Sequence, residues 1–76
     1  MITITIQQTD NIDKDFETLD QIINTLDVFS GNDEVRLKIK DQFYEITLLQ
    51  LPQKVEADNA DMLELLFGIE GIEVEL

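Results

Sequence analysis

The sequence contains no cysteine, no histidine and no tryptophan, and it has only one proline and three glycines among its 76 residues. Without cysteine, the chain has no disulfide, no thiolate nucleophile and no cysteine ligand for a metal. Without histidine, it lacks the usual general base near neutral pH and the commonest metal ligand in proteins. Ser30 is the only serine, and the absence of histidine and cysteine excludes serine–histidine and cysteine–histidine catalytic arrangements. We therefore expect no enzymatic activity and no bound cofactor.

Long apolar runs are also missing. None approaches the ~18 residues that a membrane span requires, and the first eight residues lack the basic and apolar regions of a signal peptide. We therefore expect a cytoplasmic protein with no membrane partner, and the lack of cysteine agrees with a reducing compartment. An apolar content of 43% is too high for a disordered acidic tail and predicts one folded acidic α+β domain over residues 1–76.

Basic residues are scarce. Five Lys and Arg stand against 17 Asp and Glu, which gives a formal net charge of -12. A charge of about 2 to 8 is enough to keep a small domain in solution, and a larger one destabilises the compact state by self-repulsion. The excess acidity therefore indicates that carboxylates contribute to function.

The spacing of apolar residues predicts four strands and two helices. Apolar and polar residues alternate in the predicted strands, as in Ile2, Ile4 and Ile6, which is typical of half-buried β-structure. In the first predicted helix, a stripe recurs at helical spacing and contains Phe16, Leu19, Ile22, Ile23, Leu26 and Phe29. In the second, Met62, Leu65, Leu66 and Ile69 are expected to face the core. The predicted strands are residues 1–8, 33–40, 43–50 and 71–76, and the predicted helices are residues 13–29 and 58–67.

The two middle strands are predicted to form a hairpin around a two-residue turn at Asp41-Gln42. This register pairs Ile39 with Tyr44 and places all inward apolar pairs on one face. It also places Lys38 opposite Glu45, where unlike charges attract.

Polar and small residues predict where the helices begin and end. Either Asn11 or Asp13 is expected to cap the first helix, and Asp58 the second. Gly31, in the left-handed conformation, is expected to end the first helix. Pro52 indicates a connection between the hairpin and the second helix.

The predicted order, β-α-β-β-α-β, resembles the ferredoxin-like split βαβ architecture, an antiparallel four-stranded sheet with two helices on one face. If the spatial order is the usual fourth, first, third and second strand, Arg36, Lys38 and Lys40 lie on an edge strand. Lysine there guards against strand-to-strand aggregation. Three bases among 17 acids do not favour direct nucleic-acid binding. The architecture itself indicates no function.

Acidic residues form a row on each predicted helix, away from the apolar stripe. Neighbours in a row lie ~5–6 Å apart, which resembles the separation of successive phosphates along one nucleic-acid strand. The candidate partner-binding residues are Asp13, Asp15, Glu17, Asp20 and Asp27 in the first row and Glu56, Asp58, Asp61 and Glu64 in the second.

A calcium loop is a weaker interpretation of the same residues. Asn11, Asp13 and Asp15 alternate as the first three ligands of an EF-hand loop do. The sixth position is then Phe16 instead of glycine, and the twelfth is Ile22 instead of glutamate. We therefore predict no metal site.

In size, charge and compactness the chain resembles small acidic phage proteins that block CRISPR effectors, restriction enzymes or repair enzymes. This resemblance implies a DNA mimic that inhibits a DNA- or RNA-handling protein by occupying its basic groove. The alternative is a non-enzymatic interaction or assembly module, monomeric or homodimeric through the open sheet face or an edge strand. That alternative depends on Arg36, Lys38, Lys40, Phe43 and Glu73.

Overall fold

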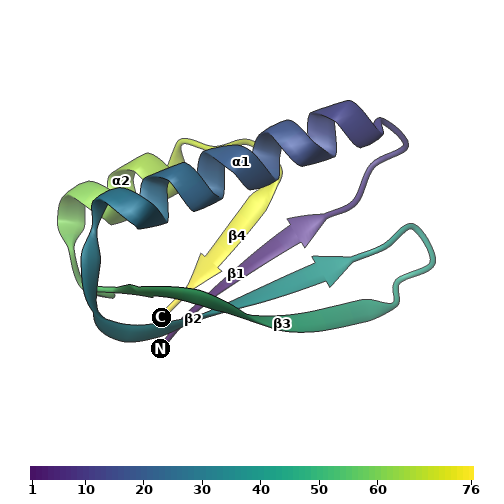
Figure 1. The fold of residues 1–76 in the computed structure, drawn as a ribbon. Helices are drawn as coiled ribbons and strands as arrows, with labels where there is room; N and C mark the ends of the chain where they lie inside the picture. The colour runs from purple at the N-terminus through teal and green to yellow at the C-terminus, as the bar shows by residue number, and fades with distance from the viewer.

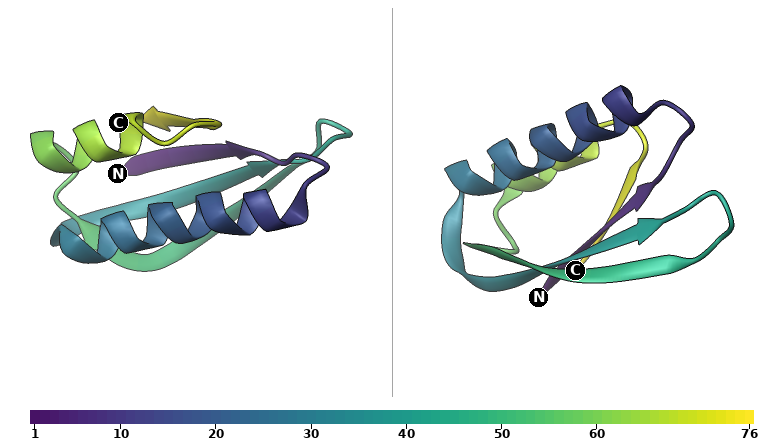
Figure 2. Two further views of the ribbon diagram at one scale, coloured as in Figure 1. Left: turned by 90° about the horizontal axis from the view of Figure 1, so that it is seen from above. Right: turned by 45° about the vertical axis from the view of Figure 1, so that its right-hand side comes forward.

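The computed structural model describes residues 1–76 as a four-stranded β-sheet with two α-helices on one face (Figure 1). The element order β-α-β-β-α-β is the predicted one. The bounds are β1 Ile2–Gln7, α1 Ile12–Val28, β2 Ser30–Lys40, β3 Ile46–Val55, α2 Ala60–Phe67 and β4 Ile72–Glu75. The two helices lie side by side and run in opposite directions (Figure 2). One face of the sheet therefore carries both helices, and the other face is open.

The sheet is mixed, so the predicted antiparallel sheet is wrong. Its strand order is β3-β2-β1-β4, with β1 and β2 parallel and the other two pairs antiparallel. α1 supplies the crossover that a parallel pair needs. In this register Ile2 lies opposite Val35 and Ile4 opposite Leu37. The two most regularly alternating strands therefore pair at the centre of the sheet, and β2 does not lie at an edge as the ferredoxin-like order predicts.

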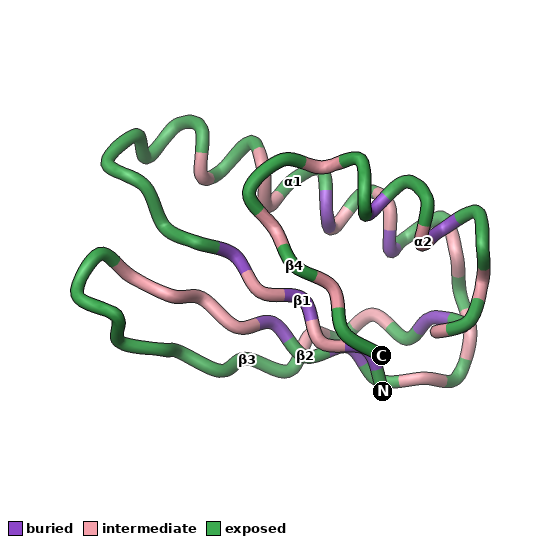
Figure 3. Tube along the Cα trace, turned by 180° about the vertical axis from the view of Figure 1, so that it is seen from behind, coloured by how far each residue is buried: buried purple, intermediate pink, exposed green.

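The hydrophobic core lies between the sheet and the helices (Figure 3). All ten buried residues are apolar, and no polar or charged residue is buried. Strands β1, β2 and β3 and both helices contribute to it, whereas β4 adds only partly buried side chains. The buried residues are Ile2, Ile4, Ile6, Ile22, Leu26, Val35, Leu37, Val55, Met62 and Leu66.

A five-residue loop, Asp41 to Glu45, joins β2 to β3, and the predicted two-residue turn is wrong. The Asp41 carboxylate accepts hydrogen bonds from the backbone N–H of Phe43 at 2.8 Å and of Glu45 at 2.9 Å. Tyr44 adopts a left-handed conformation with φ 63°. Asp41-Gln42 lacks the Asn-Gly character that short hairpin turns favour, and an aspartate at this place stabilises a wider turn with its own side chain.

The wider loop changes the pairing of the hairpin. Lys38 lies opposite Leu48, not opposite Glu45 as predicted, and Leu37 lies opposite Leu49. Since paired residues of an antiparallel ladder point to the same face, β3 places Leu49 on the helix side and Leu48 on the open side. The apolar residues of β3 are thus divided between two faces.

β3 extends through Pro52 to Val55, where the sequence predicts a connection. β3 is an edge strand, and edges and bulges are the places in a sheet that tolerate proline. The register shifts between Glu34 and Arg36, opposite this part of β3.

Gly31 lies against the end of β3. A Cβ atom on Gly31 would lie 2.4 Å from the carbonyl carbon of Val55 and 2.4 Å from the nitrogen of Glu56. Its backbone is not in the left-handed region, so the predicted role as a helix stop is wrong. Instead α1 is capped by Phe29, whose N–H donates to the carbonyl of Leu26 at 3.2 Å.

Candidate interaction surface

Side chains before and within the first turn of α1 fix the start of this helix. Asn11 is the N-cap, and its side-chain oxygen accepts a hydrogen bond from the N–H of Lys14 at 3.1 Å. The backbone N–H and the hydroxyl of Thr9 donate to the Asp15 carboxylate at 3.0 and 2.8 Å. Asp15 is half-buried, and unlike the other candidate residues its carboxylate is hydrogen-bonded, to Thr9 in the segment before the helix.

The remaining acids of α1 form one exposed line along its outer side. The line consists of Asp13, Glu17, Asp20 and Asp27, with Asn24 between the last two, and all five side chains are exposed. At 1.5 Å per residue it extends about 21 Å along the helix axis. Lys14 is the only base on the helix. We call these four carboxylates the acidic line.

α2 adds acids near the C-terminal end of α1. Asp61 lies in its first turn and Glu64 one turn further, and both are exposed. The N-cap is Asn59, whose side chain accepts from the N–H of Met62 at 3.0 Å, so the predicted cap Asp58 is wrong. Asp58 and Glu56 are exposed in the preceding connection. Because the helices are antiparallel, these acids lie towards the end of α1 that carries Asp27.

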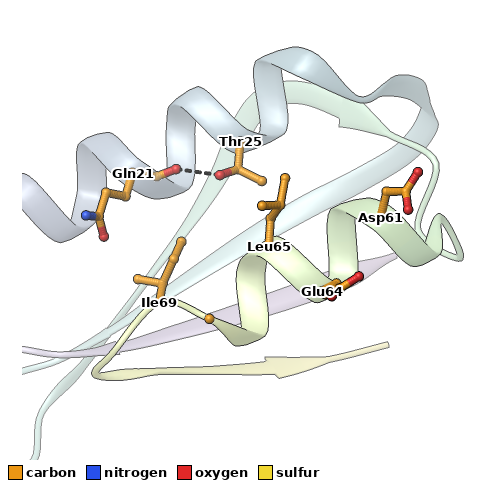
Figure 4. Close-up of a pocket in the computed structure, with 7 residues that line it drawn as sticks. Gln21, Thr25, Asp61, Glu64, Leu65 and Ile69 are labelled. Atoms are coloured by element: carbon orange, nitrogen blue, oxygen red, sulfur yellow. Dashed lines mark hydrogen bonds between the residues drawn. The ribbon is translucent and has the colours of Figure 1, made fainter.

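A shallow groove separates the two helices (Figure 4). Its wider part has a volume of about 720 Å³ and is walled by Gln21 and Thr25 of α1 and by Asp61, Glu64 and Leu65 of α2. The Thr25 hydroxyl donates to the carbonyl of Gln21 at 2.8 Å. Because Gln21 and Thr25 are neutral, the α1 wall is uncharged here. The groove continues along α1 past residues 14, 17 and 18 towards Glu70. Carboxylates therefore border both ends of the interhelical groove.

Four of the five basic residues lie in the sheet. Arg36, Lys38 and Lys40 alternate along β2, and Lys54 lies on β3. The buried Val35 and Leu37 point to the helices, so the alternate residues of β2 point to the open face. The basic row therefore lies in the middle of the open face and not, as predicted, at the sheet edge. The acidic line of α1 and this basic row therefore lie on opposite faces of the molecule, and Glu73 and Glu75 of β4 share the open face with the bases.

Two apolar side chains of the helices that the sequence places in the core are exposed. Phe16 of α1 is 60% exposed and Leu65 of α2 is 55% exposed, so both predictions are wrong. Leu65 borders the interhelical groove. Phe16 belongs to a row spaced by four, three and four residues on the side of α1 that faces away from α2. We call this row the apolar flank, and it consists of Ile12, Phe16, Leu19 and Ile23.

No group of three or more carboxylates is arranged to hold a metal ion, and no helix has the length and apolarity to cross a membrane. Comparison with known proteins gives no family model, curated protein or solved structure that matches this chain.

Proposed function

We propose that this protein inhibits a DNA- or RNA-handling protein by mimicking the charge of nucleic acid, acting in the cytoplasm as an anti-CRISPR or anti-restriction protein does. The observation that carries the proposal is the acidic line of α1, whose four carboxylates are all exposed. Asp61 and Glu64 of α2 extend this negative surface across the interhelical groove. The partner is a protein with a basic groove, and the chain itself contacts no nucleic acid.

The separation of charge over the molecule supports this proposal. The helical layer carries the acidic line with a single lysine, whereas the bases lie on the open face of the sheet. Asp13, Glu17 and Asp20 lie ~5–6 Å from one another in sequence along the line, within the screening length of about 8 Å at physiological salt, and Asp27 lies two turns beyond Asp20. Their fields therefore add, and a Lys/Arg-lined groove is attracted to them as it is to a phosphate backbone.

The test uses two variants of equal charge. The first replaces the acidic line by Asp13→Asn, Glu17→Gln, Asp20→Asn and Asp27→Asn. The matched control replaces four other exposed acids by Glu34→Gln, Glu45→Gln, Glu73→Gln and Glu75→Gln. Each variant is four charges less negative than the net charge of -12.

First, the immobilised wild type captures proteins from a lysate of the host, and duplex DNA is added to displace them. Second, the binding of DNA by each captured protein is measured while the wild type or a variant is added, over a series of salt concentrations. We expect duplex DNA to displace the captured proteins. We expect the acidic-line variant to lose at least about fourfold in inhibition, since four exposed charge pairs contribute ~0.2–1 kcal/mol each. The control should lose little. Equal inhibition and equal salt dependence for both variants would refute the proposal.

A second candidate function is an assembly module, and the edge strand β3 favours it. Residues 46–53 contain no charged side chain, and Ile46, Leu48 and Leu49 are exposed. The lysines that the sequence places at the edge lie instead on the central strand β2. An uncharged edge of this length is a template for pairing with another strand.

Light scattering separates the two functions. An assembly module forms a homodimer at low and high salt, and Leu48→Lys on the edge strand dissociates it. The acidic-line variant should leave that dimer intact. A monomer at all salt concentrations excludes assembly through β3.

A further inference from the structure

The apolar flank of α1 lies beside a groove that no element of this chain covers. The N-terminal half of α1 and the β2–β3 hairpin diverge (Figure 1), and α2 lies on the other side of α1. The groove between α1 and the β2–β3 hairpin has a volume of about 220 Å³. Its apolar walls include Ile12, Phe16 and Leu19 of α1 and Ile39 of β2. Phe16 and Ile12 are 60% and 65% exposed.

On the sheet side, Ile6 of β1 and Ile39 of β2 line this groove, with the polar Gln8 beside them. Ile39 is partly buried against the core, and Leu49 points to the helix side, because it pairs with the buried Leu37, yet remains 45% exposed. The flank from Ile12 to Ile23 extends about 16 Å along α1, or three helical turns. A surface of this shape and length fits the apolar face of one helix, as in helix-in-groove recognition.

The charge beside the groove indicates the kind of helix. Each residue turns about 100° around a helix axis, which places the apolar flank and the acidic line on adjacent strips of α1. Asp13 and Asp20 lie one turn on either side of Phe16. A helix in the groove therefore has carboxylates along one of its sides. We propose that the groove docks an amphipathic helix of the partner that carries lysine or arginine beside its apolar face.

A second copy of this chain is a poorer occupant. Two copies carry -12 each, and packing flank against flank brings two acidic lines together. The inference rests on the proposed function, since it assigns to the basic partner a helix that combines charge with an apolar face. Its test nevertheless uses a defined probe and different substitutions.

The probe is a synthetic helical peptide of leucine and lysine of about 18 residues, a length that supports a helix. A second peptide of the same charge has glutamine in place of leucine. The test variant is Ile12→Gln with Phe16→Gln. The matched control is Ile46→Thr with Leu48→Thr, which removes two side chains of similar exposure, 53% and 55%, from the open face. Neither variant alters the net charge or the buried core.

Fluorescence anisotropy gives the affinity, and amide chemical-shift changes give the location. We expect the wild type to bind the leucine peptide at least about tenfold more tightly than the glutamine peptide, with shifts at residues 12–23, 39 and 49. The Ile12/Phe16 variant should lose that preference and the control should keep it, because buried anchors dominate such interfaces. Asp13→Asn with Asp20→Asn should weaken binding of both peptides alike.

Three results overturn the inference. One is an unchanged preference in the Ile12/Phe16 variant, and another is an equal loss in the control. The third is a wild-type dimer that this variant converts to a monomer, which assigns the groove to a second copy. Each of these three results is distinguishable from failure of the proposed function. The proposed function fails if the acidic-line variant inhibits as strongly as the wild type, whichever peptide the groove binds.

Discussion

Asp27 lies at the wrong end of α1 for helix stability. It is exposed and is the residue before Val28, where the helix ends, and no basic residue lies in the last turn. The carbonyl end of a helix carries a partial negative charge, so a carboxylate there is repelled. Asp27→Asn removes the charge, keeps the shape and hardly alters helix propensity. We therefore expect this substitution to stabilise the protein.

The magnitude follows from the position of each charge. A charge near a helix end contributes ~0.3–1 kcal/mol at low ionic strength, so Asp27→Asn should raise the free energy of unfolding by that amount. Asp13→Asn, at the other end of the same helix, removes a favourable interaction of equal size and relieves only ~0.2–0.5 kcal/mol of repulsion from Glu17. The same chemical change should therefore stabilise at position 27 and leave stability unchanged or lower at position 13.

The assay is thermal unfolding followed by circular dichroism in 0.01 M and 1 M salt, where the screening lengths are about 30 Å and 3 Å. For a domain of this size, ~0.3–1 kcal/mol raises Tm by roughly 1–8 °C. The gain for Asp27→Asn should be present at low salt and largely lost in 1 M salt. A decrease in Tm, or an equal gain at both salt concentrations, would refute the electrostatic reasoning.

Three further substitutions test the fold by urea unfolding. Asn59→Ala should lower the free energy of unfolding by about 0.5–2 kcal/mol, because α2 loses its N-cap. Asp58→Ala should lower it by less than about 0.5 kcal/mol. A larger effect at Asp58 than at Asn59 contradicts the cap assignment. Gly31→Ala should destabilise by at least about 1–3 kcal/mol, because its Cβ meets backbone atoms, and a neutral result contradicts this close approach. Leu66→Ala should lower stability by about 2–5 kcal/mol and Leu65→Ala by less than about 1; equal effects contradict the assigned buried face of α2.

The type and order of the elements can be predicted from this sequence, but the strand order cannot. Ile2, Ile4 and Ile6 define a strand by alternation alone, and Ile22 and Leu26 define a helix face by spacing. The choice of neighbouring strands depends on how the apolar faces of two strands fit together across the sheet. This is a property of pairs of segments, and the pattern within one segment does not contain it. A ferredoxin-like order and the observed one contain the same segments.

The hairpin register is coupled to the loop that the Asp41 side chain stabilises. Asp41 accepts two backbone hydrogen bonds within a five-residue loop, and with this loop every pairing along β3 differs from the one that a two-residue turn gives. The alternation of β3 is weak, because Leu48 and Leu49 are consecutive and an edge strand exposes part of both faces. Hydrophobic periodicity therefore did not select the register.

The sequence predicts the exposed acids of α1 but not the exposure of Phe16. Helical spacing places Asp13, Glu17 and Asp20 on one side of α1, and the structure exposes all three. The same spacing places Phe16 in the core, but burial also requires another element to cover it. α2 lies only on the opposite side of α1, so the flank stays open. That arrangement becomes visible only when the helices and the sheet are placed together.

The acidic line and the apolar flank are more informative together than either is alone. Acidity by itself serves solubility, and single exposed apolar residues are normal on protein surfaces. Each of these strips nevertheless lowers the stability of the protein when no partner is bound. The acids repel one another along α1, and the apolar flank exposes Ile12 and Phe16 to water. With only ten buried residues, the domain has little stability to spare. A lysine one turn after Glu17 or a polar residue at Phe16 would relieve these effects without touching the core. A sequence that had only to fold would gain from such changes, whereas a surface that binds a basic, partly apolar partner needs both strips adjacent on one helix.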